Sequence, residues 1–443
     1  MKNSNKKSII TRREILFGGL SIFGASLSTS PLKTAAFNFF DGIKTENPLS
    51  GANLFRDVQK YSDLGEHRTA TEVDLKTSAW IEKELKSAGF ATQFQSFKTV
   101  QFFPSETSLK VAGKNYEAFP LWFPLTTNPR TLRAPLRKAG EQTSAHIALV
   151  KFPFDSRGSI FKGSGHAEII EKAKAGGAVG IIAVTEGTTG EIIALNALSG
   201  TEPWSIPIVC VGGKDAAALE AAIAQNAEAE IVLQGKTERA AEAKNVIGKF
   251  GNGKKTVVVS TPQSGWFRCA GERGAGIAVF LGLARWAAQQ KKLDANWIFV
   301  STTGHEFAGL GMKAFLKDLA PVPKDVFAWL HLGANIAVWN YAQTDQGLKK
   351  SGKVETRRGI PAAAELFAPL KKAFAGTEIP VTDRAIGEVT LLLKDGYRAF
   401  GIVGANAFHH VRSDLPEVTA PELLEPVAAA LTRSFDEIFA AAK

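Results

Sequence analysis

Residues 256–260 read TVVVS, residues 271–286 read GERGAGIAVFLGLARW and residues 297–301 read WIFVS. The two short runs are apolar and largely β-branched, which is typical of buried parallel strands. Over Ile277–Gln290 the apolar residues recur at helical spacing behind a cluster of glycines. This stretch therefore predicts a strand–loop–helix–strand unit of a three-layer α/β/α domain with a mostly parallel central sheet.

Polar residues follow both predicted strands at the point where each strand ends. Ser264, Glu272 and Arg273 come after the first strand, and His305 and Glu306 come after the second. In open α/β sheets, ligands bind beyond the carboxyl ends of the parallel strands. We therefore expect these side chains to lie near one site.

The composition is that of a globular protein with room for a large core, because 45% of its 443 residues are hydrophobic. The net charge is +10, but the first 36 residues alone hold six Lys or Arg against one Glu. The remaining positive charge is spread without Lys/Arg blocks, so we expect no nucleic-acid partner. Cys210 and Cys269 lie in different predicted domains, and the predicted fold does not depend on a disulfide bridge.

The N-terminal segment resembles a twin-arginine export signal. A basic stretch leads to TRREIL at residues 11–16, and an apolar, glycine-containing run extends to Leu27. That run is too short and too rich in glycine for a good membrane span, although a retained anchor is the alternative. We therefore predict that residues 1–36 are a signal, and that the mature protein is periplasmic or secreted with no stable membrane span.

Residues 106–238 differ in character from the rest of the chain. Their predicted elements are strands at His146–Phe152, Ala178–Thr185 and 206–211 and helices at Ala167–Gly176 and Asp215–Ala224. This order resembles a protease-associated (PA) domain, a small β-rich lid that is inserted in exported peptidases and receptors. The sequence shows no titratable constellation there, so we expect a discontinuous main domain, 37–105 and 239–443, to carry the chemistry.

The main domain continues with a regular alternation of helices and strands. The pattern predicts helices at Thr71–Gly89, Gly309–Leu319, Pro361–Phe374 and Pro421–Ala441 and strands at Ala91–Phe97, Val326–Leu332 and Arg398–Val403.

Residues 50–100 and 245–440 resemble the zinc aminopeptidase family, whose relatives include glutamate carboxypeptidase, glutaminyl cyclase and the transferrin-receptor ectodomain. The matching motifs are GHEFAGLG at 304–311, GERGAGI at 271–277, and His410 four residues before Asp414. In that family an Asp bridges two zinc ions. A His-x-Asp motif, a Glu-Glu pair, a later Asp and a C-terminal His complete the site, and the first Glu of the pair is the general base.

The resemblance assigns roles to individual residues of this chain. The bridging carboxylate falls on Glu272, the ligand Glu on Glu306, the C-terminal ligand on His410, and the general base on His305. The His-x-Asp motif falls within residues 260–264, which read STPQS and offer no imidazole, thiolate or carboxylate. The later Asp falls in residues 329–333, where the only possible ligand is His331.

The resemblance therefore implies a remodelled site that holds at most one metal ion. Glu272, Glu306 and His410 form a two-carboxylate, one-imidazole set that is compatible with one zinc and an open water position. His305 would then act as general base or acid. The implied function is hydrolysis of an amide or peptide-type bond in a small or peptide-like substrate.

Two other interpretations stay open at this point. In the first, the enzyme uses no metal, and Arg273 supplies the positive charge beside Glu272 while His305 and His410 transfer protons. Ser264 or Cys269 could serve as nucleophile in that scheme. In the second, the chain is a non-catalytic periplasmic binding protein on a peptidase scaffold.

Overall fold

The computed structural model describes residues 47–141, 143, 145–154, 164–200 and 202–442. The export signal predicted at residues 1–36 lies outside the described residues. Residues 46–443 form one compact unit. Among the described helices, none is both long and apolar enough to cross a membrane.

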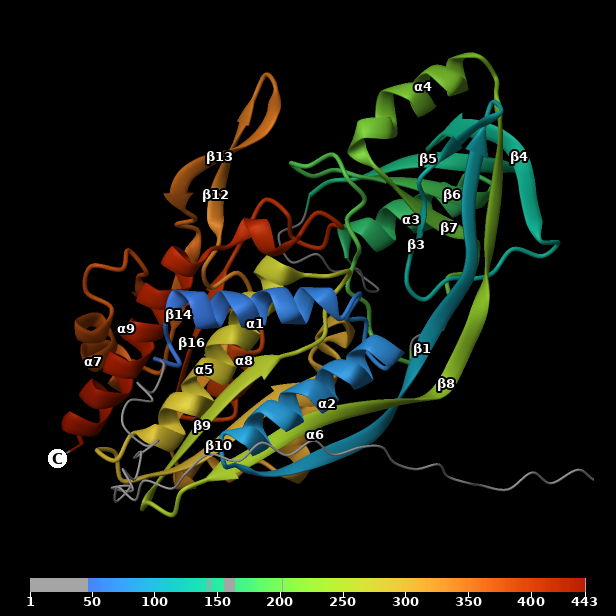
Figure 1. The fold of residues 1–443 in the computed structure, drawn as a ribbon. Coiled ribbons are helices and arrows are strands. Elements are labelled where there is room, and N and C mark those ends of the chain that lie inside the picture. Colours follow the sequence, from blue (N-terminus) through green and yellow to red (C-terminus); the bar gives the residue numbers. More distant parts are fainter. Residues whose placement is uncertain (1–46, 142, 144, 155–163, 201, 443) are drawn as a thin grey trace, which may run out of the picture. The chain divides into compact units, whose positions relative to one another are not determined.

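The centre of the molecule is a mostly parallel sheet, which confirms the predicted fold class (Figure 1). Four adjacent strands of this sheet run parallel to one another, in the order β16–β11–β9–β10. Strand β8 lies antiparallel along β10, and β14 lies antiparallel along β16. These strands span β8 (Glu228–Phe250), β9 (Lys255–Pro262), β10 (Ala295–Thr302), β11 (Val326–Leu332), β14 (Arg358–Pro361) and β16 (Ala399–Gly404).

Successive residues of β9 feed two different cores, because side chains of a strand alternate between the faces of the sheet. Val257 and Val259 join the larger core, whereas Val258 joins a second core. The larger core contains side chains of α1 (Gly51–Asp63), α2 (Glu72–Ser87), α5 (Ala275–Gln289), α7 (Phe367–Ala373) and α9 (Pro421–Ala440). The second contains side chains of α6 (Leu310–Asp318) and α8 (Val389–Lys394). Helices therefore cover both faces, which gives the three-layer architecture.

A long antiparallel ribbon connects the main sheet to the strands of the predicted insert. Strand β1 (Ala91–Val111) continues well past the predicted end at Phe97 and pairs with β8 along its length. The predicted domain boundaries at 105/106 and 238/239 therefore fall inside continuous strands, and the division into two domains stays a prediction. The insert region contains β2 (Lys114–Tyr116), β3 (Phe119–Pro120), β4 (Thr131–Lys138), β5 (His146–Phe152), α3 (Gly165–Ala175), β6 (Ala178–Thr185), β7 (Ile208–Gly212) and α4 (Ala216–Ala224).

Two local predictions differ from the structure. The helix predicted from Pro361 begins at Phe367, because Pro361 is the last residue of strand β14 and pairs with Thr382 of the neighbouring strand. The pattern also missed the exposed hairpin of β12 (Trp339–Thr344) and β13 (Gly347–Val354), whose sequence lacks a regular alternation of apolar and polar residues. The short strand β15 (Val381–Thr382) pairs with β14 and precedes the loop that leads to α8.

Candidate functional site

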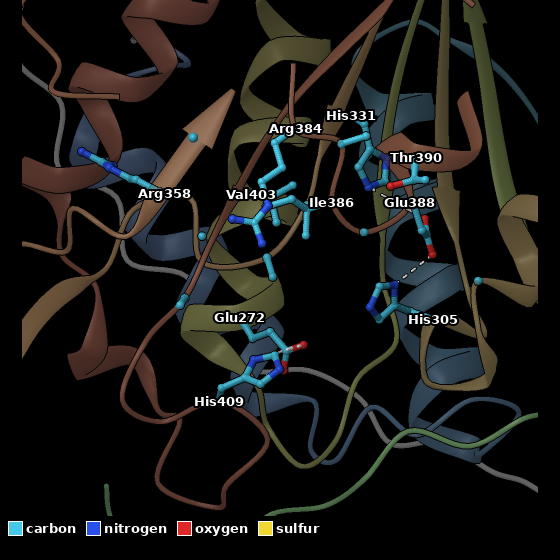
Figure 2. Close-up of a pocket in the computed structure, with 18 of the residues that line it drawn as sticks. Glu272, His305, His331, Arg358, Arg384, Ile386, Glu388, Thr390, Val403 and His409 are labelled. Atoms are coloured by element: carbon cyan, nitrogen blue, oxygen red, sulfur yellow. Dashed lines mark hydrogen bonds and ion pairs between the residues drawn. The ribbon is translucent and has the colours of Figure 1, made fainter. Parts of the chain in front are cut away.

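A cavity of about 890 Å³ opens beyond the carboxyl ends of β9, β10 and β11. Its wall includes Glu272, Arg273, His305, His331 and His410, so the structure brings together most of the residues that the sequence singled out. Figure 2 shows two corners of this wall: Glu272 lies beside His409 in one, and His305 lies beside Glu388 in the other.

Glu272 is positioned by a π-helical turn, Ala270–Gly274, that precedes α5. The carboxyl group of Asp414 accepts the backbone N–H groups of Gly271 and Glu272, at 2.8 and 3.0 Å, and so anchors this turn. A side chain at Gly271 would not fit, because its Cβ would lie 2.4 Å from a methyl group of Val418. The glycine therefore permits the close approach that brings Glu272 to the cavity.

Glu272 and Arg273 form a buried ion pair. Nη2 of Arg273 lies 2.7 Å from Oε1 of Glu272, and the two side chains are 1% and 0% exposed. Nε of Arg273 donates to the carbonyl of Ser264 at 3.2 Å, whereas neither Nη1 nor Nη2 has a hydrogen-bond partner among the described residues, so the contact with Glu272 is an ion pair without a well-aligned hydrogen bond. Burial raises the pKa of Glu272, but Arg273, His410 and His409 outweigh it and hold the pKa well below its ordinary value.

Two stacked histidines approach the same carboxylate from the loop after β16. Nε2 of His410 lies 3.3 Å and Nδ1 of His409 lies 3.9 Å from Oε1 of Glu272. Burial lowers the pKa of His409 from 6.5 to about 3, so this ring is neutral at neutral pH.

The segment around Ala194, from the predicted insert, holds His410 in place. The backbone N–H of Ala194 donates to the carbonyl of His410 at 3.0 Å, and Nδ1 of His410 donates to the carbonyl of Ala194 at 2.9 Å. These two bonds hold His410 at φ 60°, in the left-handed region that costs a non-glycine residue about 1–2 kcal/mol. A segment of the predicted insert therefore positions the main chain of a residue at the site, whereas Glu272, His409 and His410 come from the rest of the chain.

Glu272, His409 and His410 are chemically suited to one zinc ion. Their donor atoms lie within 4.8 Å of one another, and zinc bonds of about 2 Å can span such a triangle. Oε2 of Glu272 and Nδ1 of His409 have no hydrogen-bond partner in the described part of the chain. A metal-bound His usually donates its second ring N–H to a carbonyl, as His410 does here.

Arg273 opposes a metal at this position. Its guanidinium already contacts Oε1 of Glu272, the oxygen nearest to both imidazoles. Two unit charges about 4 Å apart repel by about 4 kcal/mol at an effective dielectric constant of ~20, and zinc carries two charges. The donor set thus fits zinc, but the neighbouring cation weakens the fit.

Glu306, which the sequence assigned to the metal, lies outside the Glu272–His409–His410 group. Its Oε2 accepts hydrogen bonds from Thr69 at 2.7 Å and from Ser264 at 2.8 Å. Oγ of Ser264 in turn accepts the backbone N–H of Gly304 at 2.9 Å and contacts no imidazole among the described residues.

Cys269 is likewise placed away from a nucleophilic role. Its sulfur contacts the hydroxyl of Tyr61 at 3.3 Å, and burial raises the pKa of the thiol well above its ordinary value. Among the described residues, the structure therefore does not bring the side chain of either Ser264 or Cys269 together with the imidazole of His305 or His410.

His305 pairs with Glu388, a residue that the sequence analysis did not single out. Nδ1 of His305 lies 2.9 Å from Oε1 of Glu388 (Figure 2). Burial raises the pKa of Glu388, but the hydrogen bond and the charge of His305 outweigh it, with smaller help from His331 and Arg273, and the pKa falls to about 2. Because an ionised carboxylate only accepts, Nδ1 of His305 is the donor, and in the neutral form of the ring the lone pair lies on Nε2.

His331 is a buried neighbour of this pair. Its Nδ1 contacts Oγ of Ser260 at 3.0 Å, and its Nε2 lies 3.8 Å from Oε2 of Glu388. Burial lowers its pKa to about 4, so the ring is neutral at neutral pH.

The segment 260–264, where the resemblance places the His-x-Asp motif, holds neutral hydrogen-bonding groups. The amide of Gln263 donates to Asp74 at 3.1 Å and to Ser78 at 2.6 Å, and its oxygen accepts from Ser301 at 3.0 Å. These groups are buried and satisfy one another.

Sequence reasoning missed His409 and Glu388 as wall residues of the site. The adjacency of His409 to His410 was the available signal. Glu388 had none, because it lies in a loop before the short helix α8, far along the chain from His305.

Comparison with known proteins finds similar structures but no similar sequences. No family model and no curated protein sequence matches the chain. The structure is similar to a zinc aminopeptidase from Bacillus subtilis, at 18% identity and a TM-score of 0.69, over 88% of this chain and 96% of that one. It is also similar to a peptidase M28 precursor from Shewanella amazonensis, at 17% identity and a TM-score of 0.66, over 88% and 96% of the two chains.

An aminopeptidase from Aneurinibacillus sp. strain AM-1 matches at 16% identity and a TM-score of 0.60, over 88% of this chain and 93% of that chain. At such low identity these similarities establish the fold and leave the chemistry to the site itself. The chain therefore has the zinc aminopeptidase-like fold that its sequence motifs predicted.

Proposed function

We propose that this chain is an exported hydrolase of amide or peptide-type bonds in which Arg273 supplies the positive charge that zinc supplies in aminopeptidases. The observation that carries the proposal is the ion pair between Arg273 and Glu272, fully buried and on the cavity wall. A guanidinium keeps its charge at any physiological pH, so the site has a permanent cation of its own.

The role of Arg273 would be to stabilise negative charge on the substrate. Nη2 is held by Glu272, and Nε is held by the carbonyl of Ser264, so the planar group is fixed on two sides. Nη1 takes no part in the ion pair, has no hydrogen-bond partner among the described residues and would donate to a carbonyl oxygen of the scissile bond. A fixed donor on the cavity wall stabilises the developing oxyanion without reorganisation.

The role of His305 would be to move the proton. Nε2 of His305 removes a proton from water as the water oxygen attacks the carbonyl carbon, and Glu388 stabilises the imidazolium through Nδ1. The C–N bond then breaks as the imidazolium returns the proton to the leaving nitrogen. The products are a carboxylic acid and an amine, and His305 is restored to its neutral form.

The hydrogen-bonded network of neutral groups at residues 260–264 supports the proposal that this chain lacks one of the two zinc positions of the zinc aminopeptidase family. Gln263 occupies this place with its amide shared between Asp74, Ser78 and Ser301. Amide and hydroxyl oxygens are poor ligands for zinc compared with imidazole. The proposal therefore allows at most one ion.

A second candidate is a single-zinc hydrolase with Glu272, His409 and His410 as ligands. It is favoured by Oε2 of Glu272 and Nδ1 of His409, which have no hydrogen-bond partner among the described residues. Nδ1 of His410 donates to the carbonyl of Ala194, so Nε2 meets Glu272 either as a second N–H donor or through a shared cation. When bound, zinc would polarise a carbonyl or lower the pKa of its water.

One experiment separates the two candidates. Protein purified without a His-tag is treated with a chelator, its zinc content is measured, and hydrolysis of a panel of peptides, N-acyl amino acids and aminoacyl anilides is followed. The first candidate predicts turnover without zinc that is lost in His305→Gln. The second predicts about one zinc per chain, retained in His305→Gln and lost in His410→Gln.

A third outcome, the absence of any hydrolysis, would exclude both candidates. If neither the metal-free nor the zinc-loaded protein hydrolyses any member of the panel, both candidates fail. The chain would then be a binding protein on a peptidase scaffold.

A further inference from the structure

The charged residues on the cavity wall are mostly cationic. They are two carboxylates, Glu272 and Glu388, and five cations, namely Lys313, Arg273, Arg357, Arg358 and Arg384. Each carboxylate already has a partner on the wall, since Glu272 pairs with Arg273 and Glu388 pairs with His305.

Three of the cations have no matching anion among the described residues. Arg357 pairs with Glu355 at 2.8 Å, but no ion pair is formed by Lys313, Arg358 or Arg384 with any described carboxylate. A wall with unmatched positive charge and low-dielectric surroundings attracts an anionic ligand.

Arg358 is the buried member of this group. It is only 9% exposed, its Nη1 donates to the carbonyl of Ile336 at 2.7 Å, and its Nε has no hydrogen-bond partner in the described chain. A buried cation is ordinarily paired with an anion, because leaving water costs several kcal/mol per ion. Arg358 runs along the edge of the cavity (Figure 2), so it contributes charge to the cavity rather than direct contact.

Arg384 is the member placed to touch a ligand. It lies on the loop between β15 and α8, is exposed, and extends toward the middle of the cavity in Figure 2. The same loop carries Glu388, the partner of His305. A ligand group bound by Arg384 would therefore lie near His305 and Glu388, the pair that transfers the proton in the proposed mechanism.

We infer that the substrate carries a free carboxylate and that Arg384 binds it through its planar, two-pronged guanidinium. The inference rests on the proposed function in taking this cavity as the substrate site, and it narrows the substrate to amides such as N-acyl amino acids or short peptides with a free C terminus. A cavity of about 890 Å³ lies within the range of small-molecule sites and has room for such a molecule.

The test measures binding separately from turnover. Full-length His305→Gln protein is titrated in a calorimeter with a series of N-acetyl amino acids and tripeptides. Each free acid is compared with its C-terminal carboxamide, which has the same shape without the charge. We expect the acids to bind about tenfold or more tightly than the carboxamides, because charge-assisted bidentate hydrogen bonds are among the stronger ones.

Substitutions then locate the contact. Arg384→Met should remove the preference for the acid and leave carboxamide binding within about twofold. Arg384→Lys should restore part of the preference, since lysine keeps the charge and loses the fork. Arg239→Met is the matched control, because Arg239 is an exposed arginine outside the cavity wall and should have no effect.

Equal binding of acid and carboxamide, or no binding by either series, would overturn the inference. So would an acid preference that survives Arg384→Met. The outcomes for the two proposals are distinguishable: acid-selective binding without turnover would end the hydrolase proposal alone. Turnover of acids and carboxamides at equal kcat/KM in wild type would end the carboxylate inference alone.

Discussion

Two side-chain pairs, Arg273–Glu272 and His305–Glu388, face the same cavity, and they differ in how buried they are and in whether they can exchange a proton. Arg273 and Glu272 are 1% and 0% exposed, whereas the ring of His305 is 21% exposed above a buried Glu388. A guanidinium does not give up its proton, so the buried pair can only present fixed charge. An imidazole at the cavity surface exchanges its proton readily, so the second pair is suited to acid–base work.

Under the proposed function, the contrast between the two pairs would show how the tasks of a metal ion can pass to side chains on the same fold. In zinc aminopeptidases, zinc both carries positive charge and activates water. In this proposal Arg273 carries the charge, and the His305–Glu388 pair, which lies on other elements, activates water.

The largest effect is expected from Arg273→Met. Removing the guanidinium leaves Glu272 charged and buried, which we expect to destabilise the protein by about 3–5 kcal/mol. Urea unfolding followed by tryptophan fluorescence measures the change. The matched control is the double variant Glu272→Leu with Arg273→Met, in which no charge is stranded.

We expect the double variant to recover much of the lost stability and none of the turnover. A double variant as unstable as the single one would mean that Arg273 acts through packing rather than through charge. That result would contradict the role of Arg273 as a fixed positive charge.

The next effect concerns turnover and not stability. His305→Gln should lower kcat by about 10²–10⁴-fold on any substrate of the panel, the usual contribution of general acid–base catalysis. Its unfolding midpoint should stay close to that of wild type, because the ring is partly exposed. Glu388→Gln should also lower kcat while leaving the ring in place, and unchanged kcat in both variants would exclude the pair from the chemistry.

A smaller effect is expected from pH. Burial lowers the pKa of His67 to about 3, of His331 to about 4 and of His409 to about 3. The unfolded imidazoles bind protons below pH 6.5 and the folded ones do not, so stability falls as pH drops from 6.5 toward 4. Burial raises the pKa of Asp74 to about 7 and of Asp414 to about 8.

The folded state keeps the protons of these two acids after the unfolded state has released them, so stability falls as pH rises toward 8. The two trends together predict a maximum near pH 6.5, with stability falling on both sides of it. Thermal unfolding between pH 4.5 and 8.5 measures it. A continuous rise in stability up to pH 8.5 would contradict the buried state of these groups.

The smallest effect is expected at the surface. Lys372 and Glu437 form an ion pair of 2.7 Å, but the lysine side chain is 72% exposed. Lys372→Met should leave the unfolding midpoint indistinguishable from that of wild type, because solvent screens exposed pairs. A large loss here would show that distance alone, and not burial, sets the importance of charge pairs in this protein.

Local pattern was enough to predict most of the sheet. The strands at His146–Phe152, Ala178–Thr185 and Val326–Leu332 were predicted with the bounds that the structure shows, since long apolar runs between turn residues leave little choice. The hairpin at 339–354 was missed because its residues lack that pattern. The long ribbon of β1 and β8 was only partly predicted, because its pairing depends on partners far apart in sequence.

The candidate site was predicted in part. Glu272, Arg273, His305 and His410 line the cavity, as their position after the strands implied. Glu306 lies elsewhere, with Thr69 and Ser264, because the turn after β10 directs its carboxylate to that side. Glu388 and Ala194, which forms two hydrogen bonds with His410, reach the site from distant segments, and no local sequence pattern marks such contacts.

By itself, the sequence determined the three-layer fold, the end of the sheet where the polar groups gather, and the absence of metal ligands at residues 260–264. These follow from periodicity and residue type, which act over a few residues. Only the tertiary structure decided that Arg273 meets Glu272 at 2.7 Å and that Glu388 meets His305 at 2.9 Å. Such pairings depend on how distant elements pack, and at a distance of a few ångströms burial and geometry decide whether a charge binds a metal, another side chain or a substrate.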